Sequence, residues 1–135
     1  MNLASLRAHC LAKPGATEGR PFGPEALVMK VGGKIFAIIG DDAEPLTLSL
    51  KCEPEVAVLL RQSHEAVGPG YHLNKRHWNT VTLDDTVAVD DVLEWVDDSY
   101  DLVVDGLPRR VREALRAAGQ WDPKLSDRLW RRPCR

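Results

Sequence analysis

Basic, aromatic and amide side chains gather in one short segment of the chain, GYHLNKRHWNTVTL (residues 70–83). Lys75 and Arg76 stand between two histidines, and Trp78 and Asn79 follow directly. Lysine and arginine contact phosphates, an indole ring can stack on a base, and amides can hydrogen-bond to base edges. The segment therefore predicts a nucleic-acid-binding surface made by Lys75, Arg76, His77, Trp78 and Asn79.

The same segment also fits a purely structural role, and the sequence leaves both interpretations open. Asn side chains in turns often bond to the backbone, and a Trp can close the edge of a core. Each phosphate that a protein neutralises steepens the log–log salt dependence of binding by only about 0.9. Two adjacent cations therefore supply little affinity, and we expect Lys34 and Lys51 on neighbouring strands to join them.

The charges of the chain are strongly segregated. The net charge is -2, yet residues 84–105 hold nine acids and no base, and residues 106–135 hold nine bases and three acids. Such blocks predict a dipolar surface, or a basic C-terminal segment that docks on an acidic helix. Arg112 and Arg116 form one i,i+4 row that could contact either that helix or phosphates.

Catalytic, metal-binding and membrane motifs are not found in the sequence. The three cysteines form no CxxC, and Cys52, His64, His72 and His77 match no zinc spacing. There is no GxSxG, P-loop or HExxH, and no base stands near Cys52 in the sequence. The pattern predicts a non-enzymatic protein without metal or cofactor. Because no long apolar run and no signal-peptide h-region occur, we expect a cytoplasmic protein without membrane contact.

Four segments are expected to form strands. Two β-rich runs within residues 26–40 flank Gly32-Gly33, a pair suited to a tight hairpin. Residues 46–52 alternate strictly and complete a three-stranded antiparallel meander, and residues 77–83 form a fourth strand. Residues 17–25 are expected to be a loop.

Four helices complete the expected order. Helical spacing predicts them over residues 3–11, after Pro54, over residues 89–103 and over residues 108–118. In the second helix, the apolar face is assigned to Val56, Leu59 and Leu60. The order α-β-β-β-α-β-α-α predicts an α+β fold, an antiparallel sheet with helices packed on one face. The other face would then carry Thr47, Ser49, Lys51, Trp78, Thr80 and Thr82.

Five segments resemble the MmcQ/YjbR family of small bacterial proteins: KPGATEGRPFGPE, KVGGKIFAI, LSLKCEPE, PGYHLNKRHWNTV and SYDLVV. The resemblance covers roughly residues 3–107 and implies a CyaY-like α+β fold, described as a double-wing arrangement, with a DNA-binding label. It divides the chain into a family domain (residues 1–107) and a basic C-terminal helix and tail (residues 108–135). One departure is Glu53, where Asp is usual before the helix proline, and it weakens the expected helix cap.

These observations lead to DNA binding as the main functional hypothesis, with two alternatives. The first alternative is a protein or peptide interaction module, similar to a chaperone, that uses the open sheet face around Trp78. The second is a small-molecule or enzyme site lined by Tyr71, His72 and His77.

Overall fold

The computed structural model describes residues 1–42, 44–70 and 73–120 of the chain. The elements in this part of the chain are α1 (Leu3–Leu11), β1 (Thr17–Gly19), β2 (Ala26–Val31), β3 (Lys34–Gly40), β4 (Thr47–Lys51), α2 (Pro54–Ser63), β5 (Val67–Pro69), β6 (Trp78–Thr82), α3 (Val89–Asp105) and α4 (Arg109–Gln120). None of the helices in the described ranges has the length and apolarity that crossing a membrane requires.

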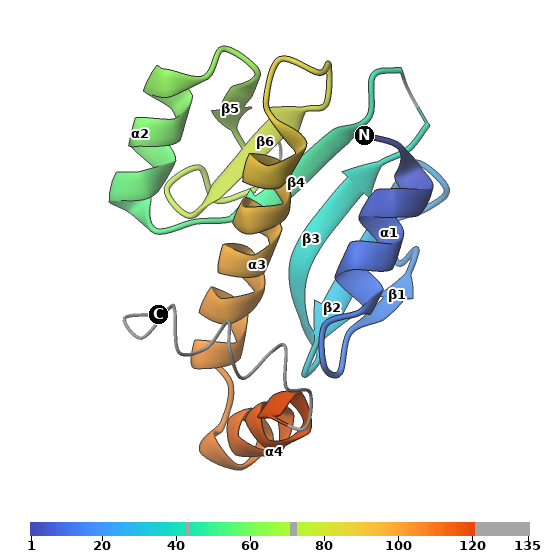
Figure 1. The fold of residues 1–135 in the computed structure, drawn as a ribbon, viewed down its shortest axis with the longest axis vertical. Coiled ribbons are helices and arrows are strands. Elements are labelled where there is room, and N and C mark those ends of the chain that lie inside the picture. The colour runs from blue at the N-terminus through green and yellow to red at the C-terminus, as the bar shows by residue number, and fades with distance from the viewer. Residues whose placement is uncertain (43, 71–72, 121–135) are drawn as a thin grey trace.

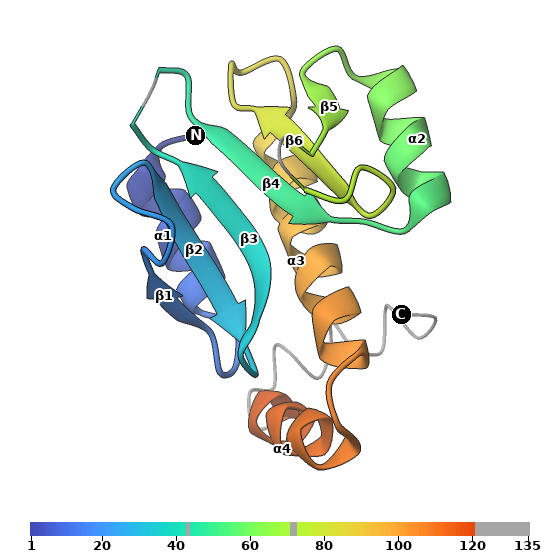
Figure 2. The same cartoon turned by 180° about the vertical axis from the view of Figure 1, so that it is seen from behind.

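The strands form one antiparallel sheet in the order β1-β2-β3-β4-β6-β5. Figure 1 shows α1 and α3 lying across one face of this sheet, with α2 beside β5 and β6. Seen from behind, the opposite face carries no described helix (Figure 2). The α+β class and the packing of helices on one face are therefore confirmed.

Two short strands were missed by the sequence prediction. β1 lies within the segment expected to be a loop, and β5 includes Gly68 and Pro69, which were expected only to break a helix. Both have three residues, too few to show an alternating pattern. They are strands because β2 and β6 offer them backbone partners at the two edges of the sheet, where a proline is tolerated.

The meander β2-β3-β4 follows the prediction but contains an irregularity. Gly32 and Gly33 both have positive φ, 57° and 80°, as a two-residue hairpin turn of this hand requires. A register shift at Met29/Lys30 leaves Phe36 as the extra residue of β3. Beside this bulge, the Ser99 hydroxyl of α3 donates to the Phe36 carbonyl at 2.6 Å and accepts from the Lys51 amide at 2.8 Å. Ser99 therefore joins β3 to β4 at this point.

The core fills the space between the sheet and α1 and α3. Leu6, Met29, Phe36, Ile39, Leu48 and Val96 are fully buried there. A charged cluster links α1 to α3 beside this core: His9 Nε2 and Lys13 Nζ lie 2.8 Å and 2.5 Å from Asp97 Oδ1. Burial by itself would raise the pKa of Asp97, but the hydrogen bonds from His9 and Lys13 outweigh it and hold that pKa well below its usual range.

The apolar face predicted for α2 is wrong. Val56 is 40% exposed and Leu59 is 58% exposed, whereas Ala57 is fully buried. The helix contacts the sheet through a small residue and a hydrogen-bond network: the Asn79 amide of β6 donates to the Ala57 carbonyl at 3.2 Å. Because Asn79 pairs with Leu50, whose side chain is in the core, α2 lies against the same face of the sheet as α3.

Candidate nucleic-acid interface

The loop that precedes β6 holds Lys75 and Arg76 at the surface. The Asn74 side chain accepts from the Arg76 amide at 3.0 Å, and the Asn74 carbonyl accepts from the His77 amide at 3.1 Å. These bonds define a compact turn, and both cationic side chains are exposed beyond it. The Cys52 amide donates to the His77 carbonyl at 2.7 Å, so the end of the loop is fixed to the end of β4.

The open sheet face carries the polar residues that strand alternation predicted. Their cross-strand pairs are Thr47 with Thr82, Ser49 with Thr80, and Lys51 with Trp78. All six side chains are half-buried, and the Ser49 and Thr80 hydroxyls are 2.9 Å apart. Directly opposed residues of an antiparallel pair lie side by side, so the Lys51 ammonium chain and the Trp78 indole are neighbours at the end nearest the loop.

Two of the predicted residues lie elsewhere. Asn79 is only 3% exposed and points to the helix-bearing face, where its side chain bonds to Ala57 and Arg61. Lys34 pairs with Val31, a core residue, so it also points toward the helix-bearing side of the sheet. The structure therefore brings together Lys51, Lys75, Arg76, His77 and Trp78, which we call the basic-aromatic surface. Tyr71 and His72 lie outside the described residues.

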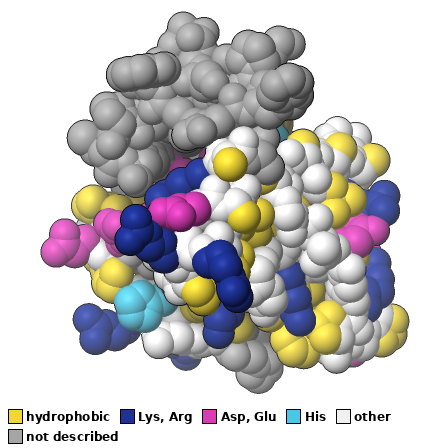
Figure 3. Space-filling model, turned by 90° about the horizontal axis from the view of Figure 1, so that it is seen from below, with side chains coloured by type: hydrophobic (Ala, Val, Ile, Leu, Met, Phe, Trp, Pro, Cys, Tyr) yellow, Lys and Arg dark blue, Asp and Glu magenta, His cyan; other side chains and the backbone are white. Residues whose placement is uncertain are grey.

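The cations of this surface lack the carboxylate partners that half of the other described lysines and arginines have. Arg7, Lys13, Arg20, Arg109 and Arg116 each pair with a carboxylate of the chain. Within residues 1–42, 44–70 and 73–120, Lys51, Lys75 and Arg76 form no such ion pair. The wider surface is not uniformly basic, however. Figure 3 shows lysine and arginine side chains as separate groups with uncharged and acidic side chains between them.

Arg61 of α2 positions the loop, and the sequence analysis did not identify it. Its Nε donates to Asn79 Oδ1 at 2.7 Å, and its terminal nitrogen donates to the Lys75 carbonyl and, at 3.3 Å, to the Trp78 carbonyl. One guanidinium group therefore holds both ends of the Lys75–Trp78 segment. The signal in the sequence was an arginine directly after the two leucines of an otherwise apolar helix stretch.

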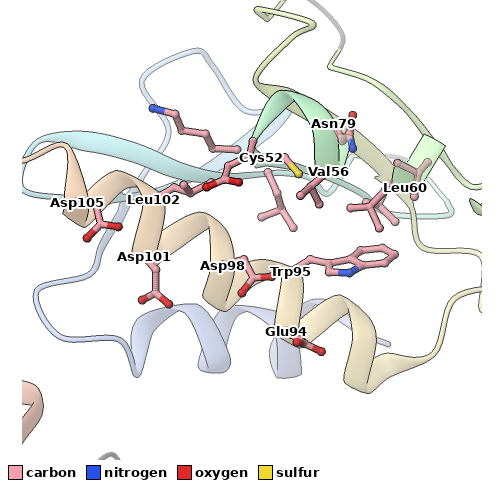
Figure 4. A pocket seen from close by; sticks show the side chains of 15 residues that line it. Cys52, Val56, Leu60, Asn79, Glu94, Trp95, Asp98, Asp101, Leu102 and Asp105 are labelled. Carbon is pink, nitrogen blue, oxygen red and sulfur yellow. The ribbon is translucent and has the colours of Figure 1, made fainter. Parts of the chain in front are cut away.

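A groove of about 600 Å³ separates α2 from α3 on the helix-bearing face. Val56 and Leu60 of α2 face Trp95 and Leu102 of α3 across it, and Asn79 lies at its sheet side (Figure 4). Carboxylates of α3 line one rim: Glu94, Asp98, Asp101 and Asp105. We call this cavity the α2–α3 groove. The sequence analysis did not find it, because its two walls come from helices separated by a loop and two strands.

The groups that line the α2–α3 groove limit the reactions that it could support. Cys52 lines it, but burial and the charge of Glu53 raise the pKa of that thiol, which leaves little reactive thiolate at neutral pH. Among the described residues, no group of three or more histidine, cysteine and acidic side chains is placed to hold a metal ion. An apolar floor with an acidic rim instead suits an amphipathic, positively charged occupant.

A six-stranded antiparallel sheet covered by helices on one face defines a small α+β fold. A family model described as YjbR matches residues 11–102. The chain belongs to the YjbR family, as the resemblance predicted.

Individual relatives agree with this assignment. The chain is 39% identical over 115 residues to a protein of Escherichia coli K12 described as uncharacterized protein YjbR, covering 85% of this chain and 98% of that protein. It is 38% identical over 96 residues to uncharacterized protein YbdF of Escherichia coli O157:H7, covering 71% and 79% of the two chains.

Solved structures show the same fold. The crystal structure of a Deinococcus radiodurans protein with a DUF419 domain superposes with a TM-score of 0.80 at 42% identity, covering 84% of this chain and 87% of that one. A Pseudomonas syringae crystal structure at 24% identity has a TM-score of 0.64 and covers 76% of this chain and 98% of that one. The second similarity shows the fold alone.

Proposed function

We propose that the protein is a non-enzymatic binding protein whose ligand is DNA and whose contact region is the basic-aromatic surface. One observation carries this proposal. Lys51, Lys75 and Arg76 have no carboxylate partner among the described residues; Lys51 lies opposite the half-buried Trp78, and Lys75 and Arg76 are exposed in the loop that leads into Trp78. Cations that the fold does not neutralise are available to phosphates, and a partly exposed indole can contact a base or a sugar.

The number of cations sets the strength and character of this binding. Three unpaired cations neutralise about three phosphates, which predicts a log–log salt slope near -2.7 on duplex DNA. Binding of this kind is weak, depends steeply on salt and carries little sequence specificity. The Asn79 amide, which the sequence analysis assigned to base edges, bonds inside the protein, so direct base recognition by that residue is not part of the proposal.

Fluorescence anisotropy of labelled single- and double-stranded DNA at two salt concentrations tests the proposal. The test variant is Lys75→Ala/Arg76→Ala, which removes two cations of the loop. The control is Arg109→Ala/Arg110→Ala on exposed α4, which changes the net charge equally. Losing two phosphate contacts lowers the slope by about 1.8. Parent affinity should therefore rise about tenfold more than variant affinity between about 200 mM and about 50 mM salt.

Two results would contradict DNA binding. One is the absence of any anisotropy change at low salt with the parent protein. The other is a Lys75→Ala/Arg76→Ala variant that binds as the control does. If a protein partner is instead captured by the parent and lost with Trp78→Ala, while the double variant retains it, the open sheet face binds protein.

A further inference from the structure

The carboxylates of the α2–α3 groove form one regular stripe. Glu94, Asp98, Asp101 and Asp105 follow one another at intervals of four, three and four residues, which places them on one face of α3. Figure 4 shows them projecting from successive turns of the helix. Trp95 and Leu102 lie beside this stripe and line the groove. The groove thus presents a row of negative charge along an apolar floor.

The C-terminal segment, residues 121–135, has the complementary composition. Its sequence WDPKLSDRLWRRPCR holds five basic and two acidic residues, together with two tryptophans and two leucines. Four of its five cations stand at intervals of four, three and four residues: Lys124, Arg128, Arg131 and Arg135. This segment lies outside the described residues.

Helix α4, which precedes this segment in the chain, contacts one end of the stripe. Arg116 of α4 pairs with Asp105, the last carboxylate of the stripe, at 2.7 Å. Arg112 donates to the Asp105 carbonyl at 3.2 Å, so α4 is anchored at this end of α3. The segment begins five residues after Arg116, and fifteen residues can span up to about 50 Å. Reach is therefore not limiting, and tethering gives an effective concentration on the order of millimolar.

We propose that residues 121–135 occupy the α2–α3 groove of their own chain, with the basic residues facing the carboxylates of α3. Apolar side chains of the segment then cover the floor beside Trp95 and Leu102. This docking extends along α3 the contact that Arg116 already makes with Asp105. The groove lies on the helix-bearing face of the sheet, so this inference does not rest on DNA binding at the basic-aromatic surface.

The cysteines of the full-length chain provide a direct test. Cys52 lines the groove, Cys134 stands next to the C-terminal residue, and Cys10 is fully buried. A short bifunctional maleimide applied to dilute protein at mildly alkaline pH, which ionises more of the Cys52 thiol, should join Cys52 to Cys134 within one chain. Mass spectrometry of the intact product and of its peptides identifies the link. We expect several-fold less of this product in Arg128→Glu/Arg131→Glu and at high salt.

Matched variants separate docking from chance encounter. Arg109→Glu/Arg110→Glu makes the same charge change on α4 and should leave the yield unchanged. Combining Arg128→Glu/Arg131→Glu with Glu94→Lys/Asp101→Lys restores opposite charges and should restore the product. The proposal is overturned if the link forms only between two chains or does not form. It is also overturned if the yield of the intramolecular product is the same in Arg128→Glu/Arg131→Glu as in the parent.

Discussion

Replacing Ser99 with alanine tests the bridge between β3 and β4. The Ser99 hydroxyl donates to the Phe36 carbonyl at 2.6 Å and accepts from the Lys51 amide at 2.8 Å, and the Ser99 side chain is fully buried. Alanine leaves both backbone groups without this partner, and the Phe36 carbonyl is buried. A buried backbone group left unpaired costs about 1–3 kcal/mol. Because the Lys51 amide is only partly shielded, we expect a total loss of roughly 2–4 kcal/mol of unfolding free energy.

Urea unfolding followed by circular dichroism measures this loss. A loss of about 3 kcal/mol moves the midpoint by roughly 2 M when the slope is about 1.5 kcal/mol per M. The control is Ser63→Ala, whose hydroxyl donates to the Leu59 carbonyl at 2.7 Å on the exposed side of α2. Its stability should stay within about 0.5 kcal/mol of the parent. A Ser99→Ala protein no less stable than this control would refute the role assigned to the bridge.

Three further predictions concern contacts between distant elements. Arg61→Ala removes the arginine donor from the Asn79 oxygen and the Lys75 carbonyl, and one of two donors from the Trp78 carbonyl, so hydrogen exchange should show faster exchange of the amides of residues 73–77 than in an Arg109→Ala control. Asp97→Asn should cost about 3 kcal/mol near neutral pH. Because the folded pKa of Asp97 lies below the unfolded value of about 3.9, its contribution is present above that value, and denaturation of parent and variant should converge as the pH falls below about 4. Gly32→Val should destabilise the protein by at least about 2 kcal/mol, because φ is 57° and a Cβ would lie 2.7 Å from Leu107; a thermal midpoint equal to that of the parent would contradict this.

Local patterns predicted the parts of the fold that local interactions determine. The Gly32-Gly33 hairpin, the strict alternation of β4 and the periodicity of α3 all appear in the structure. Alternation also placed Lys51 and Trp78 on one face correctly, because directly paired residues on adjacent strands share a side. These features depend on neighbours in sequence or on a single pairing register.

Features that depend on distant contacts could not be predicted. The sequence of α2 suggests an apolar face along Val56 and Leu59. In the structure, Ala57 and the hydrogen bonds of Arg61 determine which side of the helix contacts the sheet. Asn79 is a different case: strand alternation already sends it to the face opposite Trp78, so its assignment to base edges was wrong although the sequence held the signal. Asp97 and His9 are 88 residues apart, so no spacing rule connects them.

The position of α2 joins the two faces of the molecule. This ten-residue helix lines the α2–α3 groove with Val56 and Leu60, and through Arg61 it holds the loop that carries Lys75. Because one helix forms a wall of the groove and anchors the loop, a displacement of α2 would alter both. If an occupant of the groove changes the affinity of the loop for its ligand by some factor, thermodynamic linkage requires that the ligand change the affinity of the groove for its occupant by the same factor.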